Sequence, residues 1–262
     1  MCMDKTLWKL TVGNSPLVAT AIHDGHDTRE EIAELLSLDE SLRLREEDPF
    51  TGEWTAVAET QFVAFRSRFE VDLNRPREKA VYINPQDAWG LQVWKRRPSN
   101  DIVQRSLKEY DAFYREMENL FSDLVKKFNR FIVFDLHTYN HRRNGPEGPL
   151  SDPEGNPEVN VGTGTMDRNF WAPIVNRFIA DLRSFDFLGR NLDVRENVRF
   201  RGGNFPRWIH ENFPRKGCAL AIEFKKFFMD EWTSVPDRRQ LASISDALKS
   251  TVPGILEELE EF

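Results

Sequence analysis

Runs of apolar residues along the chain predict four β-strands. Three of these runs are almost continuously apolar, which is typical of central strands buried on both faces of a sheet. The other run is longer and alternates apolar and polar residues from Phe65 onward. The predicted strands cover residues 16–22, 61–73, 130–136 and 218–224.

Apolar residues at helical spacing lie between and after these runs. The clearest case is 101–128, where Leu107, Tyr110, Phe113 and Tyr114 begin a stripe along one helix face. The predicted helices cover 28–36, 101–128, 170–182, 237–248 and 253–260, and long loops are expected at 140–167 and 200–214. Strands that alternate with helices predict a single α/β domain over 1–262, with a mixed, mostly parallel central sheet and helices on both faces.

Composition narrows the classes of partner and compartment. A net charge of −7 disfavours nucleic acid or an anionic membrane as partner, because phosphate binding needs a dense basic face. The two cysteines allow no disulfide framework beyond one bridge, which fits a reducing cytoplasm. No apolar stretch reaches the ~20 residues needed to span a bilayer, and the N-terminus lacks a signal-peptide pattern. The oligomeric state is left open.

Two of the five histidines follow directly after predicted buried strands. These are His23 and His137. In open α/β sheets the ligand crevice lies at the carboxyl ends of the strands. The sequence therefore places two ligand-capable side chains at the edge of the sheet where a site is expected.

A third histidine lies close to the first. In IHDGHD, His23 and His26 are separated by a glycine that permits a tight turn, and imidazole suits Zn²⁺. The alternative is a loop whose histidines face solvent. Further along the chain, Asp135 shares a strand face with His137 and could orient its ring, although a buried aspartate bonded to backbone explains Asp135 equally well.

A carboxylate closes the last predicted strand. Glu223 ends an otherwise apolar run, where a charge is costly unless it has a partner or a function. Catalytic zinc sites use three protein ligands, leave one position open, and need a base near it. We therefore expect Glu223 to be the general base; an ion pair with a nearby Lys or Arg is the alternative.

Arginines near the second predicted strand are candidates for substrate binding. Asn74 and Arg75 follow this strand, and the planar guanidinium of Arg75 suits a substrate carboxylate. Arg68, within the strand, could contact the oxyanion. A solvent-exposed arginine is the alternative explanation for Arg75.

Four short motifs in order carry a resemblance to a known family. They are H-x-G-H at 23–26, D-L-N-R at 72–75, D-L-H-x-x-N at 135–140 and I-E-F at 222–224. In this combination the chain resembles the N-formylglutamate amidohydrolase family, which is related to aspartoacylases and zinc carboxypeptidases. The resemblance extends from about residue 16 to 231.

The resemblance implies a phosphorylase/hydrolase-like fold with one catalytic zinc ion. It implies His23 and His137 as metal ligands and Glu223 as the base. His26 stands where relatives carry a glutamate ligand, with Asp24 and Asp27 as nearby substitutes. It also implies that Arg68 helps to polarise the scissile carbonyl and that Asn74 and Arg75 hold the substrate carboxylate. Asn140 and His210 are further candidates for substrate binding, although no matched motif fixes the role of His210.

The expected substrate is a small molecule with a carboxylate, an N-formyl or N-acyl amino acid such as N-formylglutamate. An N-acyl amino acid deacylase or a carboxypeptidase-like peptidase would share the metal and the base but differ in the pocket. A non-catalytic metal- or ligand-binding protein is the alternative from another class. It has less support, because a structural zinc site usually has four Cys or His ligands.

Overall fold

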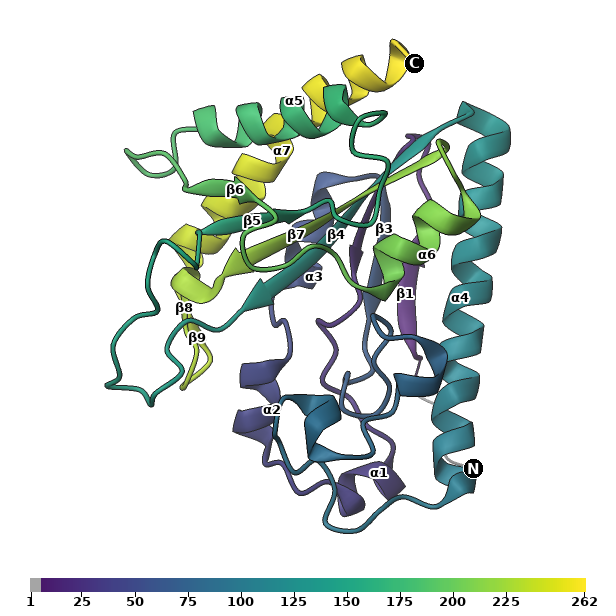
Figure 1. The fold of residues 1–262 in the computed structure, drawn as a ribbon, viewed down its shortest axis with the longest axis vertical. Helices are drawn as coiled ribbons and strands as arrows, with labels where there is room; N and C mark the ends of the chain where they lie inside the picture. The colour runs from purple at the N-terminus through teal and green to yellow at the C-terminus, as the bar shows by residue number, and fades with distance from the viewer. Residues whose placement is uncertain (1–5) are drawn as a thin grey trace.

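A computed structural model describes residues 6–262, in which a seven-stranded sheet lies between layers of helices (Figure 1). The strand order is β1-β3-β2-β4-β7-β5-β6. The strands are β1 (Trp8–Thr11), β2 (Leu17–Ala21), β3 (Thr60–Ala64), β4 (Phe131–Tyr139), β5 (Val159–Gly162), β6 (Val194–Glu196) and β7 (Gly217–Lys225). A two-stranded ribbon, β8 (Met229–Asp230) with β9 (Val235–Pro236), follows the sheet in the chain. The expected mixed, mostly parallel α/β fold is confirmed.

The four central strands run parallel to one another. β3, β2, β4 and β7 pair in parallel in that order, while β1 pairs antiparallel with β3 and β5 pairs antiparallel with β7. β6 runs parallel to β5 at the far edge. The carboxyl ends of the central strands therefore meet at one edge of the sheet, where residues that follow β2 and end β4 and β7 lie together.

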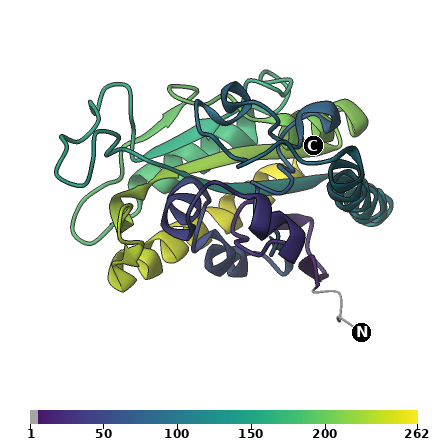
Figure 2. The ribbon, with the colours of Figure 1, turned by 90° about the horizontal axis from the view of Figure 1, so that it is seen from below.

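Helices cover both faces of this sheet. α5 (Ala172–Ser184) and α7 (Arg238–Glu260) pack against each other on one face, and α4 (Asn100–Phe128) and α6 (Asn204–Asn212) cover the other (Figures 1 and 2). The shorter helices are α1 (Glu30–Leu35), α2 (Glu40–Glu46) and α3 (Thr51–Trp54), with 3₁₀ turns η1 (Thr55–Val57), η2 (Arg77–Lys79), η3 (Pro85–Ala88) and η4 (Lys226–Phe228). In residues 6–262, no helix combines the length and apolar character that crossing a membrane requires.

Alternate side chains of the central strands enter two separate cores. In β2, Leu17 and Ala19 belong to the core under α5 and α7, whereas Val18 belongs to the core under α4. All five residues of β2 and all nine of β4 are buried. This burial on both faces explains why these strands read as continuous apolar runs rather than as alternating ones.

The predicted strand at 61–73 is largely wrong. β3 ends at Ala64, and turns follow it, with Glu70 N donating to Ser67 O at 3.0 Å and Asp72 N donating to Ala80 O at 2.7 Å. The polar residues that suggested alternation are used in ion pairs instead, since Arg66 lies 2.9 Å from Glu109 on α4. The turns bring Asp72 to the edge of the sheet where β2 ends.

Three other element predictions need correction. The segments 237–248 and 253–260 form one helix, α7, which continues through Pro253. The hydroxyl of Thr251 donates to Leu248 O within the same stretch. Of the two expected long loops, 140–167 contains β5 and 200–214 contains α6.

Candidate metal centre and active site

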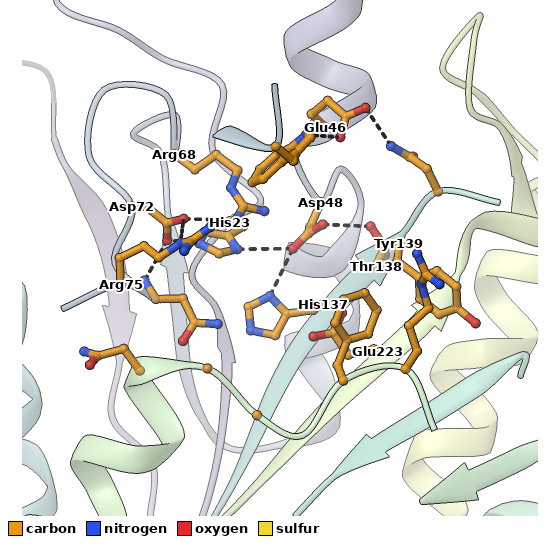
Figure 3. A pocket seen from close by; sticks show the side chains of 18 of the residues that line it. His23, Glu46, Asp48, Arg68, Asp72, Arg75, His137, Thr138, Tyr139 and Glu223 are labelled. Atoms are coloured by element: carbon orange, nitrogen blue, oxygen red, sulfur yellow. Dashed lines mark hydrogen bonds and ion pairs between the residues drawn. The ribbon is translucent and has the colours of Figure 1, made fainter. Parts of the chain in front are cut away.

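Three buried side chains converge at the carboxyl edge of the sheet. His23 follows β2, His137 lies in β4, and Asp48 follows α2. Asp48 Oδ2 lies 3.0 Å from His137 Nδ1 and 3.4 Å from His23 Nδ1. One donor atom from each residue lies within 4.8 Å of the other two, so the group could hold a metal ion (Figure 3).

The outer nitrogen of each imidazole faces a second carboxylate. His23 Nε2 lies 2.7 Å from Asp72 Oδ1, and His137 Nε2 lies 2.9 Å from Asp135 Oδ2. A carboxylate behind a metal-binding histidine fixes the ring and makes the opposite nitrogen a better donor. His23 Nδ1 is buried and has no hydrogen-bond partner among the described residues. The donor set therefore fits a divalent cation that accepts nitrogen and oxygen ligands.

Asp48 is the site residue that sequence reasoning missed. The hydroxyl of Thr138 donates to Asp48 Oδ1 at 3.0 Å. The backbone N–H of Asp48 donates to His23 O at 3.0 Å. Burial alone would raise the pKa of this carboxyl, but the neighbouring imidazoles of His137 and His23 lower it well below its usual range. In the sequence, Asp48 ends the acidic run at 46–48, which resembles a solvated helix end.

His26 does not join the group. Its Nδ1 faces Glu47, and its Nε2 lies 3.2 Å from Arg43 on α2. The structure thus puts Asp48, not His26, beside His23 and His137 as the possible third ligand. The proposed substitute Asp24 is also turned away, because it accepts a hydrogen bond from Gly52 N at 3.0 Å. Asp27, the other substitute, is likewise absent from the group.

Glu223 lies on the strand next to His137. β4 and β7 pair so that His137 and Glu223 are direct neighbours, and both line the same cavity. Burial raises the pKa of Glu223 to about 7, although the positive charge of His137 opposes the shift. No side chain or backbone group in residues 6–262 hydrogen-bonds to this carboxylate. Glu223 is thus available to exchange a proton near neutral pH.

A cavity of about 830 Å³ opens over these residues. Arg68 and Arg75 line it on the side of Asp72 (Figure 3). Arg68 Nη2 lies 2.9 Å from Asp72 Oδ2, and its guanidinium stacks on Trp89. Arg75 is partly exposed, with Nη2 donating to Asp87 O at 3.3 Å. The structure therefore brings both arginines to the cavity that contains the histidines.

Asn74 and Asn140 also line the cavity. Asn74 Oδ1 accepts from Phe205 N at 2.9 Å, which fixes the start of α6. Asn140 Nδ2 donates to Glu46 at 3.0 Å, while its Oδ1 is buried without a partner among the described residues. Both are placed to contact a ligand, and Asn74 has a structural contact as well.

His210 lies outside the cavity, contrary to the expectation that it binds substrate. Its Nε2 accepts a hydrogen bond from Ala219 N at 3.0 Å, and its Nδ1 lies 3.0 Å from Thr165 Oγ1. Burial lowers its pKa to about 4. His210 is therefore a neutral side chain that attaches α6 to β7.

Lys226 connects the strand that carries Glu223 to the segment that carries Asp48. Its buried Nζ donates to Arg45 O at 2.6 Å and to Glu47 O at 2.8 Å. Burial lowers the pKa of Lys226 to about 8. This contact fixes the backbone just before Asp48.

Comparison with protein families matches residues 15–229 to the N-formylglutamate amidohydrolase family. The chain belongs to this family. Family membership confirms the resemblance seen in the sequence, and it implies a hydrolase that acts on an amide bond of a small molecule.

Two solved structures have the same fold as this chain. An N-formylglutamate amidohydrolase from Ralstonia eutropha JMP134 matches with a TM-score of 0.75 at 16% identity, over 97% of this chain and 98% of that chain. A gene product of Agrobacterium tumefaciens matches with a TM-score of 0.67 at 13% identity, over 97% of this chain and 96% of that one. No curated protein matches the sequence.

Proposed function

We propose that this family member is a zinc-dependent hydrolase of N-formyl or N-acyl amino acids such as N-formylglutamate. One observation carries the proposal. The Nδ1 atoms of His23 and His137 converge on a single oxygen of Asp48, with Glu223 on the adjacent strand. This combination supplies both a cation site and a proton acceptor within one cavity.

His23, Asp48 and His137 would hold the metal ion. Two imidazoles and one carboxylate are a ligand set typical of catalytic zinc, and three protein ligands leave a position for water or substrate. When bound, the ion would supply Lewis-acid activation of the attacking water and of the carbonyl oxygen. Asp72 and Asp135 would keep the two imidazoles oriented.

Glu223 would move the proton. A base whose pKa is near 7 accepts a proton from the attacking water and returns it to the departing amine at neutral pH. The amide C–N bond then breaks to give a carboxylic acid and a free amino acid. The lack of any hydrogen bond to Glu223 within the described part of the chain leaves its oxygens available for both transfers.

The arginines beside Asp72 would bind the substrate. Arg75, which is partly exposed in the cavity, would hold the carboxylate of the amino acid together with Asn74. Arg68 keeps its positive charge in the cavity, since its neighbours Tyr82 and Asp72 outweigh the effect of burial and raise its pKa. Its guanidinium would stabilise negative charge on the carbonyl oxygen in the transition state. Asn140 would provide a further polar contact.

Replacement of the base tests the proposal. Glu223→Gln should retain about one zinc per chain by elemental analysis but lose roughly 100-fold or more in kcat on N-formyl-L-glutamate, the range for loss of a general base. Glu118→Gln, an exposed change on α4, is the matched control and should keep full activity.

Full activity of the Glu223→Gln protein would refute the role of Glu223. If zinc-loaded wild-type protein hydrolyses no N-formyl or N-acyl amino acid, the proposed function is refuted.

A further inference from the structure

Four arginines line the cavity without an ion pair or side-chain hydrogen bond to any residue in 6–262. They are Arg143, Arg199, Arg201 and Arg207. Arg199 is the most buried of the four, and its Nε is fully buried without a partner in the same residues. By contrast, Arg68 and Arg45 of the same cavity face carboxylates. An unpaired, partly buried guanidinium is costly unless a ligand supplies the anion.

Arg199 lies against two aromatic rings that line the cavity. Its guanidinium stacks over Tyr139, with Cζ 5.8 Å from the ring centroid, and over Phe200 at 5.5 Å. Burial and the neighbouring charge of Arg143 lower the pKa of Arg199. Arg143 lines the same cavity, so an anion bound against this wall at Arg199 would be attracted by both positive charges.

This wall lies across the metal centre from Arg75. Figure 3 shows Arg68, Asp72 and Arg75 on one side of Asp48 and His137, with Tyr139 on the other. Arg199 is on the side of Tyr139, because it stacks on that ring. The cavity therefore has two positively charged ends with the metal ligands between them.

The chemistry of an amide assigns these two ends to different parts of a substrate. A secondary amide is planar and trans, so the acyl chain and the nitrogen substituent leave the C–N bond in opposite directions. If Arg75 holds the carboxylate of the amino acid, the acyl group points toward Tyr139 and Arg199. A formyl group would place only a hydrogen atom there.

We propose that Arg199, with Arg143, forms an anion subsite for the acyl group, and that the preferred substrate is an amino acid whose acyl group ends in a carboxylate. This inference rests on the proposed function and specifies its substrate class. Hydrolysis would add water across the amide bond and release a dicarboxylic acid and the amino acid. The dicarboxylate's distal end would remain at Arg199.

A matched pair of substrates tests the subsite. N-succinyl-L-glutamate and N-butyryl-L-glutamate have acyl chains of equal length, and only the succinyl group carries a charge. For the wild-type protein we expect kcat/KM to favour the succinyl compound by about tenfold to a hundredfold, the range for a hydrogen bond to a charged group. Arg199→Gln should reduce this ratio toward one. Arg115→Gln, an exposed change on α4, should leave the ratio as in the wild type.

Binding of the acid product gives a readout that does not depend on turnover. Succinate should bind the wild-type protein more tightly than butyrate in calorimetric titration, and Arg199→Gln should remove the difference. Arg199→Gln removes the stacking on Tyr139 and Phe200 but no side-chain hydrogen bond within residues 6–262, so its melting temperature should change by at most a few degrees. A wild-type succinyl-to-butyryl ratio near one, or a ratio that survives in Arg199→Gln, would overturn the inference while leaving the proposed function intact.

A second pair of substrates tests whether the amino acid, rather than the acyl group, reaches Arg199. N-formyl-L-glutamate and N-formyl-L-norvaline differ in the charge at the end of the amino-acid side chain. If Arg199→Gln lowers the ratio for this pair and leaves the succinyl-to-butyryl ratio unchanged, the subsite binds the amino-acid side chain and the acyl assignment is wrong. If no acylated amino acid is cleaved, the proposed function fails, and the succinate titration still decides whether the anion subsite exists.

Discussion

Asp48 Oδ2 is contacted by both His23 and His137. Burial lowers the pKa of His137, but the nearby Asp135 and Asp48 outweigh it and raise the value well above that of a free histidine. The buried carboxylates Asp48, Asp72 and Asp135 thus surround two imidazoles, and this negative charge favours a cation at the centre. A bound divalent ion would take the place of protons on the rings.

Two substitutions distinguish the ligand set in the structure from the one expected from the sequence. Asp48→Asn should weaken zinc binding by more than about 100-fold, because it removes a charged ligand and leaves the two histidines. His26→Asn should leave zinc affinity within about threefold, because its ring contacts Glu47 and Arg43 instead. Competition with a zinc-binding dye measures both. The reverse order of affinities would restore His26 as the ligand.

Strand-end position made part of the site predictable from sequence. His23, His137 and Glu223 follow or end strands whose apolar runs are unmistakable, so parallel pairing alone brings them to one edge. Asp48 could not be found in this way, since its place depends on contacts of the intervening helices with the sheet. His26 has suitable chemistry and spacing, but nearby residues of α2 turn its ring away.

At the scale of elements, α6 is a helix within a segment that the sequence predicted to be a loop. Its nine residues pack on β7 and on the aromatic residues of α4, and it begins against Asn74. His210 links the helix to the Ala219 backbone through a nitrogen that accepts a hydrogen bond and therefore has no proton. Protonation of the ring would break this link.

The variant His210→Ala should reduce the free energy of unfolding by about 1–2 kcal/mol at pH 7, because it leaves Ala219 N–H without its partner. A histidine whose pKa falls to about 4 on folding stabilises the protein above its unfolded pKa, about 6.5. That contribution is lost as the pH falls from about 6.5 to 4. Urea unfolding at several pH values should show the difference between wild type and variant shrinking over this range.

The same variant should keep its kcat/KM when folded, since His210 does not line the cavity. A large loss of kcat/KM with unchanged stability would instead support the role in substrate binding that the sequence suggested.

Elements were predictable where burial leaves a strong periodic signal. β2, β4, β7 and α4 occur within one or two residues of the expected start, because each has a long apolar run or stripe. β1 and β6 are only four and three residues long, too short for a periodic signal. The break expected at Pro253 is absent, because α7 is held along its length against α5 and the core.

On the scale of the whole molecule, the candidate metal ligands come from sequence positions 23, 48 and 137, with Glu223 further on. The segments that carry them are the end of β2, the turn after α2, and the ends of β4 and β7. A ligand that binds all of them binds only the folded chain. Its binding energy therefore adds to the free energy of unfolding.

Zinc should raise the melting temperature of the metal-free protein. At a free zinc concentration about 100 times Kd, binding adds about 2.7 kcal/mol. For a chain of this size, that corresponds to an increase of roughly 5–10 °C. Differential scanning calorimetry with and without a chelator measures the shift. Asp48→Asn should show little of it, and an equal shift in that variant would mean that zinc binds elsewhere.

The hydrogen bond from Phe205 N to Asn74, which fixes the start of α6, has a consequence for redesign of the cavity. A Cβ at position 203 would lie 2.3 Å from Asn74 Oδ1, so the segment that contains Asn74 and the segment that contains Gly203 are in close contact. One segment continues to Arg75 and the other comes from Arg199, which stand at opposite ends of the cavity. A change in the length of either segment will therefore displace both Arg75 and Arg199. A new substrate specificity is better sought by exchanging side chains while the backbone is left unaltered.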